Sequence, residues 1–384
     1  MKERQIPTKI RILHCADIHL DSAFSKASLK RGEERRAELR AVFSDMMKYV
    51  KNGNIDILLI AGDLFDSEYA TSETLSLLQR ELSACRIPVF ISPGNHDFYG
   101  EHSIYACGKF PPNVYIFKSE ELTCINIEEL NTAVYGWAFC DSFFRHSPIA
   151  DKKASDSSKL NLICGHADLN SPLSEQCPIT KSDIENFGAH YAAFGHIHVK
   201  PEQKVAGKTA YAYSGCLEGR SFDECGIGGA WLIEAEKDEN GYSVNTKRLN
   251  FGRSRFEILN LDITGESELS RIQEKAASEI KRLGLGSGAA LRVVLTGAVP
   301  LSLSLRGIEE DLLGLDYIEY KNETSPIYDA SYLENDMTIK GELYRYLLPL
   351  LTSGTPEERV SAANALKIGL AALENREITT QMEI

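Results

Sequence analysis

Several features that would place this chain in a specialised class are missing from its sequence. No two of its nine cysteines form a Cys-x-x-Cys pair, and their irregular spacing indicates neither a disulfide framework nor a zinc ribbon. We therefore expect free, mostly buried thiols in a reducing, cytoplasmic setting. No stretch approaches about 18 uninterrupted apolar residues, so no membrane span is expected. The polar residues 1–7 contain no apolar core of a signal peptide.

A basic excess, which free-standing nucleic-acid-binding proteins usually show, is missing as well. The 384 residues carry a formal net charge of -13. Residues 255–384 contain 13 basic and 21 acidic side chains, so this third contributes about -8. A nucleic-acid substrate would therefore need a local basic groove, bound metal ions or a partner protein to supply the attraction.

Side chains of the metal-binding type are present, and they follow apolar, strand-like runs at five places. They are Asp17 and His19, Asp63, Asn95, His166, and His196 and His198. Ligands of open α/β sheets gather at the carboxyl ends of the strands, so we expect these side chains to converge. Seven ligands are too many for one tetrahedral ion and suit two ions that share a carboxylate. Such a site, with mixed oxygen and nitrogen ligands, is typical of phosphate-ester hydrolysis.

The spacing within these motifs supports shared ion positions. Asp17 and His19 are two residues apart at a strand end, where both side chains point to one face and can reach one ion. His196 and His198 repeat this spacing. Asp63 follows an apolar strand and is the candidate carboxylate for bridging two ions about 3.5–4 Å apart. Each motif alone is also compatible with an ordinary surface or core pair, and only their combination favours a dinuclear site.

The neighbours Asn95 and His96 should serve different tasks because adjacent side chains diverge. Asn95 offers a carbonyl oxygen to a metal, which leaves His96 free to face the substrate. Asp66 lies about one turn beyond Asp63, and a helix or loop cap is the alternative interpretation of this residue.

The order of predicted elements indicates an α/β fold. Strands at residues 9–15, 55–61 and 87–92 alternate with helices at 29–50 and 71–85, which predicts a parallel sheet. The later segments are mostly strand-like and predict a second sheet packed on the first; they lie at residues 133–139, 160–164, 192–198, 210–214 and 230–235. We predict a two-sheet β-sandwich flanked by helices over residues 1–252.

The pattern changes near residue 253. A smaller α+β domain is predicted over residues 253–330 from strands at 256–263, 291–295 and 317–320 and helices at 266–283 and 303–313. Residues 331–384 are predicted to form a helical tail with helices at 343–351 and 356–375. The tail is expected to be too short for a core of its own and therefore to dock on a partner.

The motif order D-x-H, G-D-x-x-D, G-N-H-D, G-H and G-H-x-H resembles that of the calcineurin-like metallophosphoesterases. The flanking residues are similar to the SbcD branch of DNA-repair exonucleases, the meiotic-recombination-eleven type. They lie at residues 14–20, 61–66, 92–97 and 213–224. The resemblance extends over about residues 9–235 and is architectural beyond them.

The resemblance implies roles for individual residues. It implies that one ion is held by Asp17, His19, Asp63 and His198, and the other by Asp63, Asn95, His166 and His196. The metal of this branch is usually Mn²⁺. His96 would be the proton donor to the leaving oxygen, oriented by Asp66; some nucleases of the branch carry His at the position of Asp66, so the balance of exonuclease and endonuclease action stays open. Arg220 belongs either to a phosphate-contacting loop or to an ordinary surface turn.

The function implied is that of a Mn-dependent DNA exonuclease and endonuclease of the 3′→5′ type, acting in DNA repair near the nucleoid. The implied partners are DNA and an SbcC-like, SMC-type ATPase that would bind the helical tail, while a homodimer is left open. A phosphomonoesterase or cyclic-nucleotide phosphodiesterase on the same fold is the alternative. The acidic composition favours that alternative slightly, whereas the extra C-terminal domain favours the nuclease.

Overall fold

A computed structural model describes residues 7–24, 29–67, 69–198, 201–239, 241–300, 303–305, 307–308 and 314–373. The chain divides into two compact units, Met1–Phe256 and Glu257–Ile384. Strand β12 (Gly241–Asp262) begins in the first unit and ends in the second. Among the described helices, none is long and apolar enough to cross a membrane.

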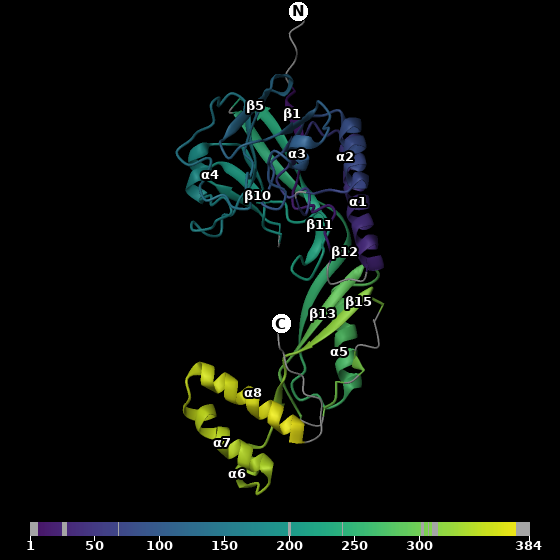
Figure 1. Ribbon diagram of the computed structural model, residues 1–384, viewed down its shortest axis with the longest axis vertical. Coiled ribbons are helices and arrows are strands. Elements are labelled where there is room, and N and C mark those ends of the chain that lie inside the picture. The colour runs from purple at the N-terminus through teal and green to yellow at the C-terminus, as the bar shows by residue number, and fades with distance from the viewer. Residues whose placement is uncertain are drawn as a thin grey trace, which may run out of the picture. The chain divides into compact units, whose positions relative to one another are not determined.

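The N-terminal unit contains a mixed sheet with the strand order β12-β11-β1-β2-β3-β4. Figure 1 labels β1, β11 and β12 of this sheet. Strands β1 to β4 are parallel to one another, and β11 is antiparallel to β1 and β12. The bounds of these strands are β1 (Lys9–Cys15), β2 (Ile57–Ile60), β3 (Val89–Ile91), β4 (Val114–Ile116) and β11 (Gly226–Asp238).

Both faces of this sheet are buried, which explains its continuous apolar strands. Helices α1 (Leu29–Asn52) and α2 (Ser72–Cys85) cover one face, and Leu13 and Leu58 pack in the core that includes them. The next residue of each strand points the other way, as strand geometry requires. Ile12 and Leu59 accordingly belong to the core between the two sheets.

The second sheet has the order β5-β6-β7-β8-β10-β9. Its strands are β5 (Thr123–Ile127), β6 (Thr132–Gly136), β7 (Leu160–His166), β8 (Tyr191–Gly195), β9 (Gln203–Ala206) and β10 (Thr209–Tyr213). Strands β6, β7, β8 and β10 are parallel, and α4 (Lys181–Phe187) packs on the outer face through Ile184 and Phe187. Two short elements, α3 (Ile104–Cys107) and the 3-10 helix η1 (Glu128–Leu130), lie in the connections. The predicted sandwich of two sheets flanked by helices is confirmed.

The two sheets join at the carboxyl ends of their parallel strands. In the first sheet Cys15 pairs with Ile60, and Ile60 pairs with Ile91. In the second sheet His166 pairs with Gly195. The ring nitrogen Nδ1 of His166 lies 3.0 Å from the carbonyl oxygen of Ala61, the residue that follows β2. The loops that follow these strands therefore start from one region of the unit.

The C-terminal unit begins with hydrogen-bonded strands in the order β15-β13-β12, which belong to the same eight-stranded sheet order. It contains β13 (Ala289–Thr296) and β15 (Tyr317–Asn322), and a two-stranded sheet adds β14 (Ala298–Pro300) and β16 (Ser325–Ile327). Helix α5 (Leu269–Arg282) packs against β12, β13 and β15 through Ile272, Ala276 and Ile280. The predicted helix at 303–313 falls mostly outside the described residues.

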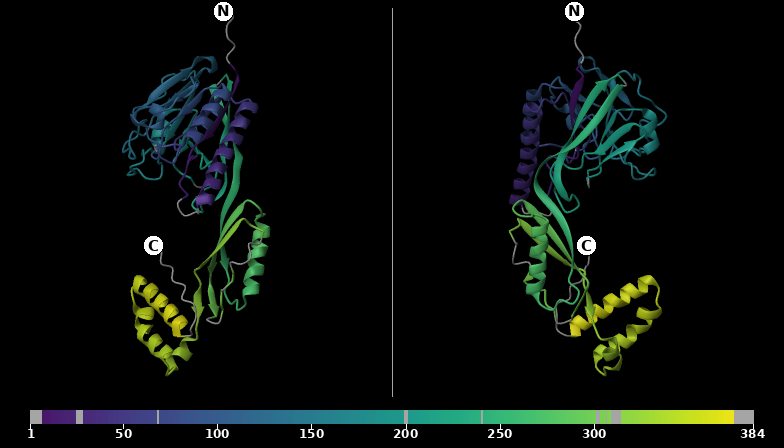
Figure 2. Two further views of the ribbon diagram at one scale, coloured as in Figure 1. Left: turned by 45° about the vertical axis from the view of Figure 1, so that its right-hand side comes forward. Right: turned by 180° about the vertical axis from the view of Figure 1, so that it is seen from behind.

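The helical tail has a core of its own, so the prediction that it lacks one is wrong. Helices α6 (Ala330–Asn335), α7 (Ile339–Ser353) and α8 (Pro356–Leu373) form this part, and α7 and α8 make a helical hairpin (Figure 2). Their cluster contains Leu333, Tyr344, Leu347, Ala362, Leu366 and Leu370. Residues spaced by four, such as Leu366 and Leu370, line one face of α8 and make this small core.

Candidate metal centre

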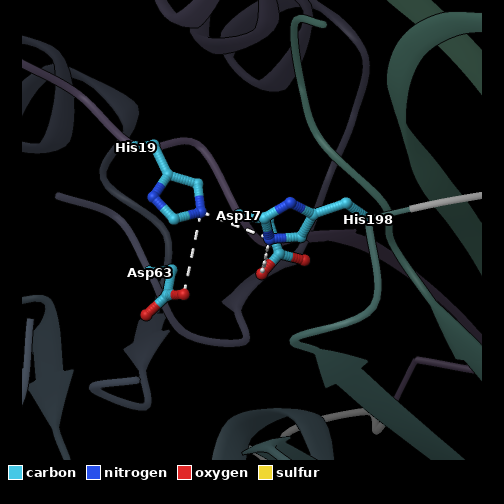
Figure 3. Close-up of side chains that lie close together, drawn as sticks. All are labelled: Asp17, His19, Asp63 and His198. Atoms are coloured by element: carbon cyan, nitrogen blue, oxygen red, sulfur yellow. Dashed lines mark hydrogen bonds and ion pairs between the residues drawn. The ribbon is translucent and has the colours of Figure 1, made fainter. Parts of the chain in front are cut away.

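Four of the seven predicted ligands meet in one buried cluster. The ligand atoms of Asp17, His19, Asp63 and His198 all lie within 4.8 Å of one another (Figure 3). His19 Nε2 is 3.3 Å from His198 Nε2 and 3.7 Å from Asp63 Oδ2. His198 Nε2 is 3.6 Å from Asp17 Oδ1. The group comes from the ends of three strands of both sheets, and it is the same set that the resemblance implies for one ion.

The remaining three lie beside this group, and His166 contacts it through Asp63. His166 Nε2 lies 3.4 Å from Asp63 Oδ2 and 3.0 Å from Asn95 Oδ1. The ring of His196 is 5.2 Å from that of His166, measured between centroids. Asp63 Oδ2 thus faces both His19 and His166, which is the placement that a bridging carboxylate would need.

The cluster is buried and charged. Asp17 and Asp63 are each 1% exposed, and His19 and His166 are fully buried. Burial opposes the charged form of Asp63, yet the neighbouring His166 and His19 hold the pKa of this carboxyl well below its usual range. Burial likewise opposes a charged imidazole, but Asp63 and Asp17 raise the pKa of His166 to about 9. The two carboxylates therefore favour positive charge between them.

A cation fits this donor set. Asp17 Oδ2 is buried and has no hydrogen-bond partner, whereas Asp17 Oδ1 accepts from the backbone N–H of His196 at 2.9 Å. A buried carboxylate oxygen without a donor is unfavourable unless another group satisfies it. Oxygen and imidazole donors together suit a divalent first-row metal ion, and we find the residues compatible with one.

The backbone at these positions is strained. The φ angles are 51° at Asp17, 48° at His19, 49° at Asp63 and 104° at His196, in the left-handed region that residues other than glycine rarely occupy. Each such residue costs about 1–3 kcal/mol and persists where the surroundings fix it, most often at functional sites. Here the backbone N–H of His19 donates to the backbone oxygen of Asp63 at 3.0 Å, so the loops that follow β1 and β2 hold each other in place.

Gly62 allows the close approach of the two sheets at the centre. A Cβ atom at this position would lie 2.0 Å from His166 Nδ1, and the φ angle of 96° is also unfavourable for other residues. The glycine before Asp63 is therefore required by packing as well as by the turn.

His96 lies at the exposed side of the cluster, where it can meet a substrate. Its ring centroid is 4.9 Å from that of His19, and its backbone N–H donates to Asp63 Oδ1 at 3.1 Å. Its ring nitrogen Nδ1 is 3.3 Å from the backbone oxygen of Asp66. The Asp66 carboxylate, which was expected to orient His96, lies within 4.8 Å of a His96 ring nitrogen and 3.0 Å from His19 Nδ1.

Arg220 is turned into the protein, not out toward solvent. Its side chain is 16% exposed and forms ion pairs with Asp66 at 2.8 Å and with Glu224 at 2.5 Å. Glu224 Oε1 is also 3.0 Å from His198 Nδ1. Glu224 ends the segment 213–224 that contributes to the family resemblance, but the sequence predicted no role for it.

Two further residues at the site were missed. Cys216 lies with Glu224 beside His198. Burial raises the pKa of the Cys216 thiol to about 12, so it remains protonated. Asp97 is buried and fixes the loop of Asn95, because it accepts from the N–H of Gly94 at 2.8 Å and from the Tyr105 hydroxyl at 2.6 Å.

The sequence around this centre is similar to that of known phosphoesterases. The family model for calcineurin-like phosphoesterases matches residues 10–200. The uncharacterized metallophosphoesterase YhaO of Bacillus subtilis (strain 168) is 26% identical over 312 residues, which are 76% of this chain and 73% of that protein. The DNA double-strand break repair protein Mre11 of Methanopyrus kandleri is 24% identical over 360 residues, 86% of this chain and 75% of that protein. A component of the nuclease SbcCD from Staphylococcus epidermidis is 22% identical over 246 residues, 56% of this chain and 63% of that protein.

Proposed function

This chain carries a calcineurin-like metallophosphoesterase domain, and from that premise we propose that it is a two-metal hydrolase of phosphodiester bonds in DNA. The observation that carries the proposal is the position of Asp63. One oxygen of its carboxylate faces His19 at 3.7 Å and His166 at 3.4 Å, so a single group can serve two adjacent ion positions. Two ions sharing a carboxylate are a recurring device for in-line displacement at phosphorus.

We assign the two ion positions to two overlapping sets of side chains. One ion would be held by Asp17, His19, Asp63 and His198, and the other by Asp63, Asn95, His166 and His196. When bound, two divalent ions, which we take to be Mn²⁺, would acidify water and balance the negative charge of the phosphate. The protein's own contribution is a buried frame that fixes these donors before the ions arrive.

His96 is the residue that we propose for proton transfer to the leaving oxygen. It is exposed beside an otherwise buried cluster, so a substrate can reach its ring. Two contacts hold the residue in place at this edge: its backbone N–H donates to the Asp63 carboxylate, and its ring Nδ1 lies against the backbone oxygen of Asp66. An imidazole in this position can give a proton to the departing sugar oxygen and so limit the charge that builds up there.

DNA is proposed as the substrate because one relative is named for DNA repair and another for a nuclease. One is a DNA double-strand break repair protein and the other is part of a nuclease. We propose 3′→5′ exonuclease and single-strand endonuclease action in the cytoplasm at the nucleoid, with residues 253–330 capping the DNA. The net charge of -13 means that metal ions or a partner must offset the repulsion between protein and DNA.

An SbcC-like, SMC-type ATPase is the proposed partner, and the helical tail is the proposed contact. The tail exposes apolar side chains although it has its own core: Ile339 is 70% exposed and Tyr346 is 78% exposed. Large exposed apolar residues gathered on a small helical part indicate a surface that another protein covers. Normal co-purification of a chain truncated before Met337 with its ATPase would contradict this assignment.

A substrate panel with Mn²⁺ tests the function. End-labelled duplex DNA, nicked plasmid, p-nitrophenyl phosphate and cyclic AMP are compared for the wild type, with EDTA as the metal-free reference. We expect metal-dependent release of nucleotides from the duplex 3′ ends. Rapid hydrolysis of the monoester or of cyclic AMP without any cleavage of DNA would instead support the phosphomonoesterase or cyclic-nucleotide phosphodiesterase.

A further inference from the structure

Two carboxylates outside the proposed ligand set approach the outer nitrogens of two proposed ligands. Glu224 Oε1 lies 3.0 Å from Nδ1 of His198, and Asp66 Oδ1 lies 3.0 Å from Nδ1 of His19. In both histidines the other nitrogen, Nε2, faces the cluster, where the two Nε2 atoms are 3.3 Å apart. The contact at His198 has hydrogen-bond geometry, while the one at His19 is an ion-pair approach without a well-aligned hydrogen bond.

A single guanidinium holds both carboxylates. Arg220 Nη1 donates to Asp66 Oδ1 at 2.8 Å, and Arg220 Nη2 and Nε donate to Glu224 Oε1 at 2.5 and 3.0 Å. The backbone N–H of Arg220 donates to Glu224 Oε2 at 2.7 Å. The side chains of Arg220, Glu224 and Asp66 are 16%, 5% and 23% exposed, so water competes little for these contacts.

From this geometry we propose that Arg220 is a positioning residue: it holds Asp66 and Glu224 against His19 and His198 and so orients both rings toward one ion position. A histidine whose Nδ1–H donates to a carboxylate presents the lone pair of Nε2 to a metal, and the carboxylate makes that nitrogen a stronger donor. The inference rests on the proposed function, because it concerns one of the two proposed ions.

The same contacts argue against a direct role of Arg220 in holding substrate. Its Nε and both terminal nitrogens already donate to carboxylates, which occupies three of the five N–H groups, and the side chain is only 16% exposed, so little of the guanidinium is offered to a phosphate. Displacing either carboxylate would in turn release His198 or His19. The planar guanidinium directs its donors to the two carboxylates along fixed directions, which the ammonium of lysine does not do.

The arrangement serves one ion position only. His166, proposed for the other ion, places Nδ1 3.0 Å from the backbone oxygen of Ala61, which no substitution at Arg220 would remove. Loss of the Arg220 network should therefore weaken one ion and spare the other. This asymmetry separates positioning from a general structural role, because a loosened fold would affect both ions.

The proposal is tested by titrating the metal-free full-length protein with Mn²⁺. Calorimetry and electron paramagnetic resonance monitor the binding. For Arg220→Met and Glu224→Gln we expect one of two Mn²⁺ affinities to fall by about 10–100-fold and the signal of coupled ion pairs to be lost. The double variant should be no weaker than the weaker single variant, because both changes break the same contact. Arg220→Lys should restore part of the loss.

The matched control is Arg253→Met, which removes an arginine that is 51% exposed and is paired with Asp45. It should bind both ions as the wild type does. Unchanged ion affinities in Arg220→Met together with a raised KM for DNA would overturn the proposal in favour of substrate contact. Equal weakening of both ions, or a variant that melts earlier in EDTA, would overturn it in favour of a structural role. A wild type that binds no ion pair would instead reject the proposed function, and this inference with it.

Discussion

Gly94 lies so close to Asp63 that a Cβ atom on the glycine would come within 2.1 Å of Asp63 Oδ1. The loop that carries Asn95 is therefore seated directly on the carboxylate that both proposed ions share. Because the same Cβ would also lie 2.8 Å from the backbone nitrogen of Asp63, a rotation of the Asp63 side chain alone could not relieve the clash.

Gly94→Ala should displace Asp63 and reduce both Mn²⁺ binding and hydrolysis. A displacement of about 1 Å in a catalytic group can cost roughly 100-fold in rate, so we expect a loss of at least that order. Calorimetric titration with Mn²⁺ and the rate of DNA cleavage measure it. Gly100→Ala is the control, since a Cβ at Gly100 meets nothing within 4 Å. Wild-type affinity for Mn²⁺ in Gly94→Ala would contradict the expected displacement.

Asp63→Ala should lose both ions, whereas Asn95→Ala should lose only one. The reason is that Asp63 Oδ2 faces both His19 and His166, while Asn95 Oδ1 approaches only His166, at 3.0 Å. Metal analysis of the purified variants gives the number of ions bound per chain. One tightly bound ion remaining in Asp63→Ala would show that this carboxylate does not bridge.

His96→Ala should keep both ions and lower kcat by about 10²–10⁴-fold, the usual contribution of a general acid. Its side chain stands at the exposed edge of the cluster and is not among the proposed ligands. Single-turnover cleavage of labelled DNA measures the change. His102→Ala removes an exposed histidine from the following turn and should leave the rate unchanged. A His96→Ala rate within a few-fold of the wild type would remove His96 from the chemistry.

The sequence was sufficient to predict both the sandwich and the meeting of its motifs. Buried strands such as Ile57–Ile60 read as continuous apolar runs, and parallel strands bring their carboxyl ends together. Those two rules place five separated motifs in one region without any knowledge of their distances. Short or polar edge strands escaped prediction, and β9 (Gln203–Ala206) is an example, because three of its four residues are exposed.

The partners of charged side chains could not be predicted in the same way. Asp66 was expected beside His96, and its carboxylate does lie within 4.8 Å of a His96 ring nitrogen, but it also pairs with Arg220, 154 residues away, a partner that the sequence did not indicate. A carboxylate near two possible partners pairs with one or the other according to side-chain rotamers and local backbone angles. Positive φ angles, such as 49° at Asp63, cannot be predicted from the residue pattern. The core of the helical tail was missed for a different reason. It depends on the turn between α7 and α8, which brings their apolar positions face to face and which helical periodicity alone does not predict.

His14 lies behind the proposed centre and is fully buried between the two sheets. Its Nδ1 is 3.0 Å from the Tyr191 hydroxyl and its Nε2 is 3.2 Å from the Phe194 carbonyl oxygen. Burial lowers the pKa of His14 from 6.5 to about 3; the Phe194 carbonyl and Asp17 favour the charged form, and Arg248 opposes it. The folded protein therefore keeps this ring neutral at pH values where the unfolded chain would bind a proton.

Acidification below pH 6.5 should consequently destabilise the N-terminal unit. In the unfolded state His14 binds a proton below about pH 6.5, whereas in the folded state it binds one only below about pH 3. The loss is about 1.4 kcal/mol per pH unit, or roughly 2 kcal/mol between pH 6.5 and pH 5. Unfolding by urea in the presence of EDTA can be monitored by the fluorescence of Trp137 and Trp231, which both lie in this unit. His14→Gln should lose about 2 kcal/mol less than the wild type over that interval, while His102→Gln should keep the wild-type slope. Equal slopes for all three proteins would show that His14 is protonated in the fold.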